Sequence, residues 1–171
     1  MYYPLARAYL KQAQADFNSY ETLLLDEQPA SQWLHCLQMS MEKTGKAYLA
    51  TCGSSLTQLR KSHLAFGKFI RTLERNTRIL QYWGYSKHQL HQHLKQLLPV
   101  IDSVERLAPA LAAGANAEYP WKLPDGKILI PCTYPFHTIR SDLESVKGRN
   151  VLKILERSLK DPYWHKAFGI V

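Results

Sequence analysis

One stretch of the sequence constrains the fold more than any other, because its apolar residues recur at every third or fourth position. These residues are Leu90, Leu94, Leu97, Ile101, Val104, Leu107 and Leu111. Such spacing places them on one side of an α-helix, and that side needs a partner surface to bury it. Ser86 precedes the stretch as an expected helix cap. Pro99 lies inside it, so we expect a kink or a division into two helices there.

Four further segments have helical periodicity, and they span residues 3–26, 31–52, 61–83 and 139–160. Ser31 is expected to cap the second of them. Gly45 lies inside that helix and costs about 1 kcal/mol relative to Ala, which a close helix–helix contact or a local bend would explain. Gly148 predicts a bend in the last helix. The pattern predicts an all-α fold, an antiparallel up-and-down bundle of about five helices.

The positions expected to face the core are apolar or small in each of these segments. They are Leu10, Ala13, Phe17, Tyr20 and Leu24; Leu34, Leu37, Met41, Thr44 and Tyr48; Phe66, Ile70, Leu73 and Leu80; and Leu143, Val146, Val151, Leu155 and Leu159. A helix that buries one such row against its neighbours gains most of its stability from that packing.

Residues 113–138 form an irregular, aromatic-rich insertion before the last helix. Asp125-Gly126 predicts the tight turn of a small hairpin that carries Ile128 and Ile130. The aromatic residues of the insertion lead us to expect that it packs against the bundle. Loops of this length in a compact domain are uncommon and often functional.

Composition excludes several classes of protein. The chain has 171 residues, which suits a single domain over residues 1–171, and 46% hydrophobic with 21% charged residues is typical of a globular fold and not of disorder. No apolar run approaches the roughly 18 residues needed to span a membrane, and the first residues lack a secretory signal. Cys36, Cys52 and Cys132 contain no CxxC pair, so we expect buried thiols in a cytoplasmic protein.

A basic stripe is the strongest physical signal for function. The chain carries 22 basic and 14 acidic side chains, a net charge of +8, which favours polyanionic partners. Five cations fall on one side of the predicted helix 61–83, namely Lys61, Lys68, Arg71, Arg75 and Arg78. Such a row can follow phosphates, and Tyr82, Trp83 and Tyr85 just beyond it can stack on bases. The alternative is a solvated helix face with aromatic residues closing one end of the bundle.

The second predicted helix resembles that of the HEPN domain family, which carries a Gln-x-x-x-Glu-Lys-x-x-Lys-Ala pattern. Gln38, Glu42, Lys43, Lys46 and Ala47 match this pattern in register. The preceding helix fits the family too, and a His at position 63 stands where many members have one. The segment 118–121, Glu-Tyr-Pro-Trp, is similar to a loop of some HEPN-like proteins.

The resemblance implies a helical bundle, often a homodimer, that accompanies a small nucleotidyltransferase in toxin–antitoxin pairs. Some members cleave RNA without a metal, through an Arg-x(4–6)-His motif. No Arg of this chain has that spacing, because His63 follows Arg60 too closely and His165 lies too far from Arg157. Residues from separate helices can still converge on one phosphate, so His63 with Arg60 and Arg71 remains the catalytic candidate.

Two other groups of residues have competing interpretations. Glu42 and Lys46 have the spacing of an i,i+4 ion pair, while the resemblance implies that Lys43 and Lys46 contact a nucleotide. His88 and His91 share a helix face as a metal pair would, but no third ligand lies nearby in sequence, so with His93 they are expected to be surface histidines. We therefore predict no metal site and no cofactor.

Three functions follow from these observations. The first is a HEPN-like module that binds RNA or a nucleotide, with a nucleotidyltransferase as partner. The second is an unconventional, metal-independent ribonuclease that uses His63. The third is a helical scaffold protein with no nucleic-acid role. The basic stripe and the missing Arg–His motif favour the first.

Overall fold

The computed structural model describes residues 3–111 and 114–170, and it confirms the all-α fold. Its elements are α1 (Tyr3–Leu25), α2 (Ala30–Thr51), α3 (Leu56–Arg60), α4 (Ala65–Leu73), α5 (Thr77–Trp83), α6 (Lys87–Glu105), β1 (Trp121–Lys122), β2 (Ile128–Leu129), the 3-10 turn η1 (Pro131–Thr133), α7 (His137–Glu144), α8 (Val146–Lys160) and α9 (Pro162–Ala167). Among the described residues, no helix combines the length and the apolar character that a membrane span requires.

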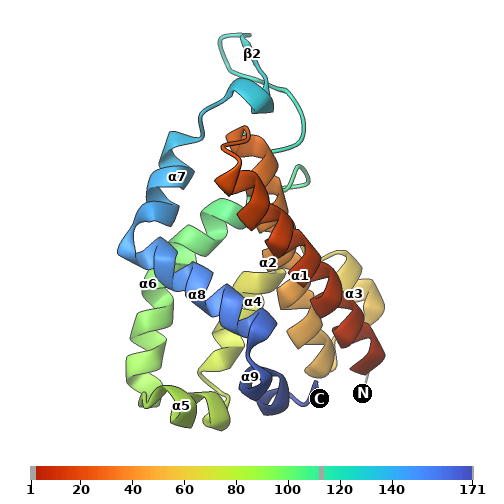
Figure 1. Ribbon diagram of the computed structural model, residues 1–171, viewed down its shortest axis with the longest axis vertical. Helices are drawn as coiled ribbons and strands as arrows, with labels where there is room; N and C mark the ends of the chain where they lie inside the picture. The colour runs from red at the N-terminus through yellow and green to blue at the C-terminus, as the bar shows by residue number, and fades with distance from the viewer. Residues whose placement is uncertain (1–2, 112–113, 171) are drawn as a thin grey trace.

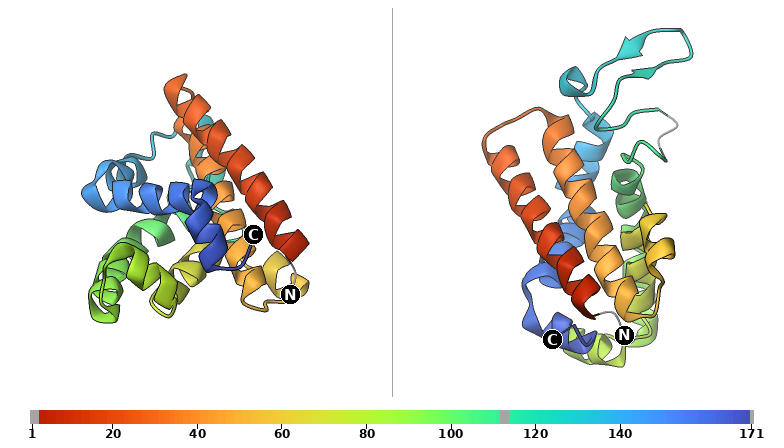
Figure 2. Two further views of the ribbon diagram at one scale, coloured as in Figure 1. Left: turned by 60° about the horizontal axis from the view of Figure 1, so that its bottom comes forward. Right: turned by 90° about the vertical axis from the view of Figure 1, so that its right-hand side faces the viewer.

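α1 and α2 lie side by side in opposite directions, with α1 on the outside of the molecule (Figures 1 and 2). α2 also contacts α4, α6 and α8, so it is buried on more than one side. The residues predicted to face the core from this helix, Leu34, Leu37, Met41, Thr44 and Tyr48, are buried. Pro29 occupies the N-cap position and Ser31 is buried, so the prediction that Ser31 caps the helix was wrong.

Gly45 allows α2 to touch the start of α4. A methyl group added at Gly45 would lie 2.2 Å from the carbonyl carbon of Ala65 and 2.4 Å from the backbone nitrogen of Phe66. The close helix–helix contact offered as one explanation of Gly45 is therefore confirmed.

The predicted helix 61–83 is divided into α4 and α5, and α3 precedes them. Asn76 lies at the break between α4 and α5. Its side chain accepts hydrogen bonds from the backbone nitrogens of Arg78 and Ile79 and so begins α5. Phe66, Ile70 and Leu73 are buried as predicted. On α5, Ile79 is buried and Leu80 is only partly buried.

The leucine-rich segment forms one helix, α6, which begins with a capping box between Ser86 and Gln89. Pro99 lies inside α6 without dividing it. Pro99 is exposed, so the backbone carbonyl that it leaves without a donor can meet water. The predicted apolar row is buried from Leu90 to Val104, and Leu107 is buried just beyond the helix end.

The predicted last helix, 139–160, is divided at Ser145, where α7 ends and α8 begins. Ser145 caps α8 by accepting a hydrogen bond from the backbone nitrogen of Gly148 at 3.0 Å. A methyl group at Gly148 would lie 2.2 Å from the carbonyl oxygen of Asp142, so this glycine permits a tight corner between two helices. The corner turns Val146 outward, where it is 66% exposed, and Leu24 at the end of α1 is 44% exposed; both had been expected in the core.

β1 and β2 form the predicted hairpin, with Trp121 opposite Leu129. The hairpin projects at one end of the molecule, and α5 and α9 lie at the other (Figures 1 and 2). Trp121 packs edge-on against Tyr134, with ring centroids 5.0 Å apart. Ile128 and Ile130 are 65% and 50% exposed, so the prediction that the insertion packs down was wrong at its tip.

The cysteines differ from expectation as well. Cys36 is partly buried, but Cys52 and Cys132 are exposed. Cys52 follows α2 and Cys132 lies in η1, and both side chains reach solvent there. Burial of all three thiols was therefore a wrong prediction.

Candidate functional site

The five cations of the predicted stripe are all exposed, but they do not lie on one helix. Lys61 follows α3, Lys68 and Arg71 belong to α4, Arg75 lies in the turn after α4, and Arg78 belongs to α5. A straight row along one helix was therefore wrong, because the helix breaks redirect the side chains that follow them.

The fold instead gathers two of these cations around a hollow between α4 and α6. Arg71 and Arg75 line it from one side, and Lys95 lines it from α6. Its volume is about 480 Å³, and Leu94 and Leu98 contribute apolar surface to it. We call this hollow the basic hollow; its lining residues are Arg71, Glu74, Arg75, His91, Leu94, Lys95 and Leu98.

The basic hollow has an excess of positive charge. Glu74 is the acidic residue in its lining, and one Glu74 carboxylate oxygen lies 2.7 Å from Nδ1 of His91. Within residues 3–111 and 114–170, no ion pair involves Arg71, Arg75 or Lys95. These three cations are therefore available to an anion from outside the chain.

The positive surface continues toward α5. Arg75 also lines a neighbouring hollow of about 560 Å³ together with Arg78. Arg78 donates a hydrogen bond to the backbone oxygen of Lys166 at 3.3 Å, and Lys68 donates one to the Ser62 hydroxyl at 3.0 Å. These neutral partners orient both cations and leave their charge uncompensated.

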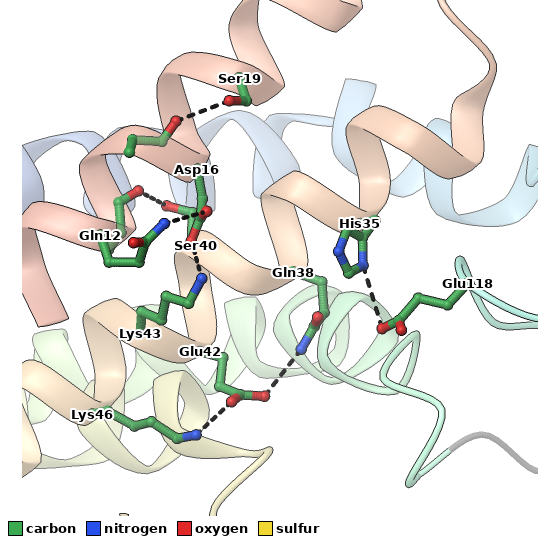
Figure 3. A network of polar contacts seen from close by, with 12 residues as sticks. Gln12, Asp16, Ser19, His35, Gln38, Ser40, Glu42, Lys43, Lys46 and Glu118 are labelled. Carbon is green, nitrogen blue, oxygen red and sulfur yellow. Dashed lines mark hydrogen bonds and ion pairs between the residues drawn. The ribbon is translucent and has the colours of Figure 1, made fainter. Parts of the chain in front are cut away.

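A second candidate site is built on one side of α2, where Gln38, Glu42 and Lys46 follow one another at steps of four (Figure 3). Lys46 Nζ lies 2.5 Å from one oxygen of Glu42, and Gln38 Nε2 donates to the other at 3.2 Å. Both charged side chains are 8% exposed. The predicted Glu42–Lys46 ion pair is confirmed.

His63 joins this network from the turn between α3 and α4. Its Nδ1 lies 3.1 Å from Oε2 of Glu42, and its side chain is 37% exposed. In the described part of the chain, Nε2 of His63 makes no hydrogen bond, and neither Arg60 nor Arg71 is bonded to the ring. A carboxylate that holds one ring nitrogen leaves the other free for proton transfer.

Lys43 faces the opposite helix. Its Nζ lies 2.6 Å from Oδ2 of Asp16 on α1, and this ion pair links α1 and α2 (Figure 3). Lys43 and Lys46, which the resemblance assigns to a nucleotide, therefore both hold carboxylates of the protein itself.

Glu105 is a buried carboxylate that the sequence did not indicate. It accepts hydrogen bonds from the backbone nitrogens of Phe66 at 2.8 Å and Gly67 at 3.2 Å, at the start of α4. Burial raises the pKa of Glu105 to about 7, although these two hydrogen bonds act in the opposite direction. The negative charges of Asp102 and Glu42 add to the increase in pKa.

The histidines of α6 lie in different surroundings. His88 is exposed, and His91 is paired with Glu74. Among residues 3–111 and 114–170, no group of three His, Cys, Asp or Glu side chains has the arrangement of metal ligands.

Lys95 and Glu105 are the residues of these sites that sequence reasoning missed. Each lies on α6, at least 20 positions from the segment it meets on α4. Local periodicity marks α6 as amphipathic but does not show which helix packs beside it.

Comparison with protein-family models, with curated proteins and with solved structures found no match.

Proposed function

We propose that this chain is a HEPN-like helical module that binds RNA or a nucleotide through the basic hollow. The observation that carries the proposal is the convergence of Arg71, Arg75 and Lys95, none of which is engaged in an ion pair in the described ranges. When cations on a protein surface bind phosphates, they displace the counterions that surround the nucleic acid, so such binding depends on salt. The net charge of +8 attracts polyanions to the protein as a whole.

The HEPN resemblance of residues 33–49 adds the class of partner. It supports a homodimer and a small nucleotidyltransferase as the protein that accompanies this chain in a toxin–antitoxin pair. In that arrangement the basic hollow supplies the contact with RNA or nucleotide. A small nucleotidyltransferase encoded beside this chain would support the pairing.

Removing two cations from the basic hollow is expected to weaken RNA binding. Arg71→Ala combined with Arg75→Ala should lower the affinity for single-stranded RNA at least about tenfold, because each lost charge-assisted contact removes a strong hydrogen bond. The slope of log affinity against log salt should become shallower by about 1.4, since each phosphate contact contributes about 0.7. Fluorescence anisotropy across a salt series measures both quantities.

Lys122→Ala combined with Lys127→Ala is the matched control. It removes the same net charge from the hairpin, whose two lysines are exposed and lie outside the basic hollow. The proposal fails if the arginine variant and the lysine variant have the same affinity and the same salt slope. A wild-type protein with no measurable RNA affinity would favour the helical scaffold.

The contact between His63 and Glu42 favours a second candidate, a metal-independent ribonuclease. Glu42 orients the imidazole, so that Nε2 can take the proton of a ribose 2′-hydroxyl as that oxygen attacks the adjacent phosphorus. A nearby cation would stabilise the charge that develops on the phosphate oxygens, and Arg60 and Arg71 are the candidates. The bond between phosphorus and the 5′-oxygen breaks as that oxygen takes a proton from water, which leaves a 2′,3′-cyclic phosphate, and His63 returns its proton to the solvent.

For this candidate, His63→Gln is expected to reduce RNA cleavage at least about 100-fold, the range of a lost general base. RNA affinity should stay within about twofold, because His63 lies outside the basic hollow. Product analysis on labelled RNA, with the cyclic phosphate as the signature, measures the reaction. Intact RNA after incubation with the wild-type protein would eliminate the ribonuclease, as would equal cleavage by His63→Gln.

A further inference from the structure

A separate cavity lies between the end of α5, the first half of α6 and α8. Trp83 and Tyr85 line it together with His93, and α8 contributes Asn150, Lys153 and Arg157. Its volume is about 280 Å³. His91 of the basic hollow and His93 of this cavity are two residues apart on α6, so they face nearly opposite sides of the helix. The two sites are therefore distinct.

The cavity is cationic on its α8 side. Asn150, Lys153 and Arg157 follow steps of three and four, which place them on one face of the helix. No Asp or Glu belongs to the lining, and in the part of the chain that the structure describes neither Lys153 nor Arg157 takes part in an ion pair. An anion entering here meets two uncompensated charges and the amide of Asn150.

The opposite side is aromatic. The ring centroids of Trp83 and Tyr85 are 6.2 Å apart, and that of Tyr85 lies 5.8 Å from that of His93. Trp164 is completely buried and packs against Trp83, with the ring centroids 5.5 Å apart. Burial lowers the pKa of His93, which keeps its ring neutral at neutral pH. The rings of Trp83 and Tyr85 lie nearly perpendicular, with an interplanar angle of 83°, so a planar ring can stack on one of them and meet the edge of the other.

We propose that this cavity binds a single nucleotide, with its phosphate at Lys153 and Arg157 and its base against Tyr85 and Trp83. Its volume of about 280 Å³ lies just below the usual range of small-molecule sites, roughly 300–1,000 Å³, so the cavity can hold at most one nucleotide unit and not an oligonucleotide. Cations on one side and aromatic rings on the other match the two chemical parts of a nucleotide. The unit can be a free mononucleotide or the 5′-phosphorylated end of an RNA. This site does not depend on the basic hollow.

Isothermal titration with AMP, adenosine and inorganic phosphate tests the proposal. AMP should bind the wild-type protein at least about tenfold more tightly than either fragment, since only AMP contacts both sides of the cavity. Lys153→Gln and Arg157→Gln should each weaken AMP binding at least about tenfold through the loss of a charge-assisted contact. Lys147→Gln is the matched control, because it removes one exposed cation from the same helix outside the cavity.

Three results would overturn the nucleotide site. They are no AMP binding at about 1 mM, phosphate or adenosine binding as tightly as AMP, and equal AMP affinity in Lys153→Gln and Lys147→Gln. RNA pentamers with a 5′-phosphate or a 5′-hydroxyl distinguish the two sources, because only the first should compete with AMP if RNA ends are bound. AMP affinity should be unchanged in Arg71→Ala with Arg75→Ala, so this site and the basic hollow can fail separately.

Discussion

Replacing Gly45 with alanine is expected to lower the free energy of unfolding by about 3 kcal/mol or more, the range of severe steric substitutions. The added methyl group would lie 2.2 Å from the carbonyl carbon of Ala65, a distance that no two non-bonded carbon atoms tolerate. The atoms it meets belong to the backbone of α4, so no rotamer change can relieve the clash, and α2 and α4 must separate. The higher helix propensity of Ala returns only about 1 kcal/mol.

Urea denaturation followed by circular dichroism measures this loss. Gly114→Ala is the control, because a methyl group there has no neighbour within 4 Å and the backbone conformation needs no glycine. Its free energy of unfolding should change by less than about 0.5 kcal/mol. If Gly45→Ala unfolds at the same urea concentration as Gly114→Ala, α2 and α4 are not in contact as the structure describes.

The stability of the protein should decrease as pH rises through neutrality, and Glu105 should cause much of the decrease. Its pKa is about 7 in the folded protein, against an ordinary value of 4.5. The folded state therefore holds a proton that the unfolded state releases. This contribution is fully present below pH 4.5 and is lost as pH rises through 7. The shift corresponds to a change on the order of 3 kcal/mol.

Glu105→Gln removes this proton and keeps an oxygen that can accept a hydrogen bond from Phe66. Between about pH 5 and about pH 8, the unfolding free energy of the wild type should fall relative to that of the variant by on the order of 3 kcal/mol, because only the wild type loses the Glu105 proton. Urea titrations at several pH values measure it. Glu144→Gln is the control, because Glu144 is exposed, and its difference from wild type should stay constant. A constant difference for Glu105→Gln as well would contradict the raised pKa.

Much of the core could be predicted from sequence because burial of an amphipathic helix is encoded at short range. The row from Leu90 to Val104 is buried as the spacing predicts, and so is the row from Leu34 to Tyr48. The Glu42–Lys46 pair was predictable for the same reason, since residues four apart are neighbours on any helix. The HEPN resemblance, the RNA or nucleotide ligand and the nucleotidyltransferase partner stay predictions that the experiments above test.

The positions of the helix breaks were less predictable. Ser31 has a capping residue's chemistry but is buried, whereas Asn76 and Ser145 begin new helices inside segments that were expected to be continuous. A polar residue caps a helix only when the chain turns there, and the turn depends on what packs beside it. Gly148 illustrates this dependence, because it marks a contact between α8 and the end of α7 and not a bend at its own position.

The sequence by itself determined the helical class, the apolar rows and the excess of positive charge, since each depends on residue type and local spacing alone. Only the tertiary structure decided which of these charges meet. Lys95 lines the same hollow as Arg71 and Arg75, and Lys153 lines the same cavity as Tyr85, although these residues belong to segments distant in sequence. His63 likewise reaches Glu42 on α2 and not the arginines near it in sequence. Sites of this kind form where helices pack together, and the packing partner of each helix is set by the chain as a whole.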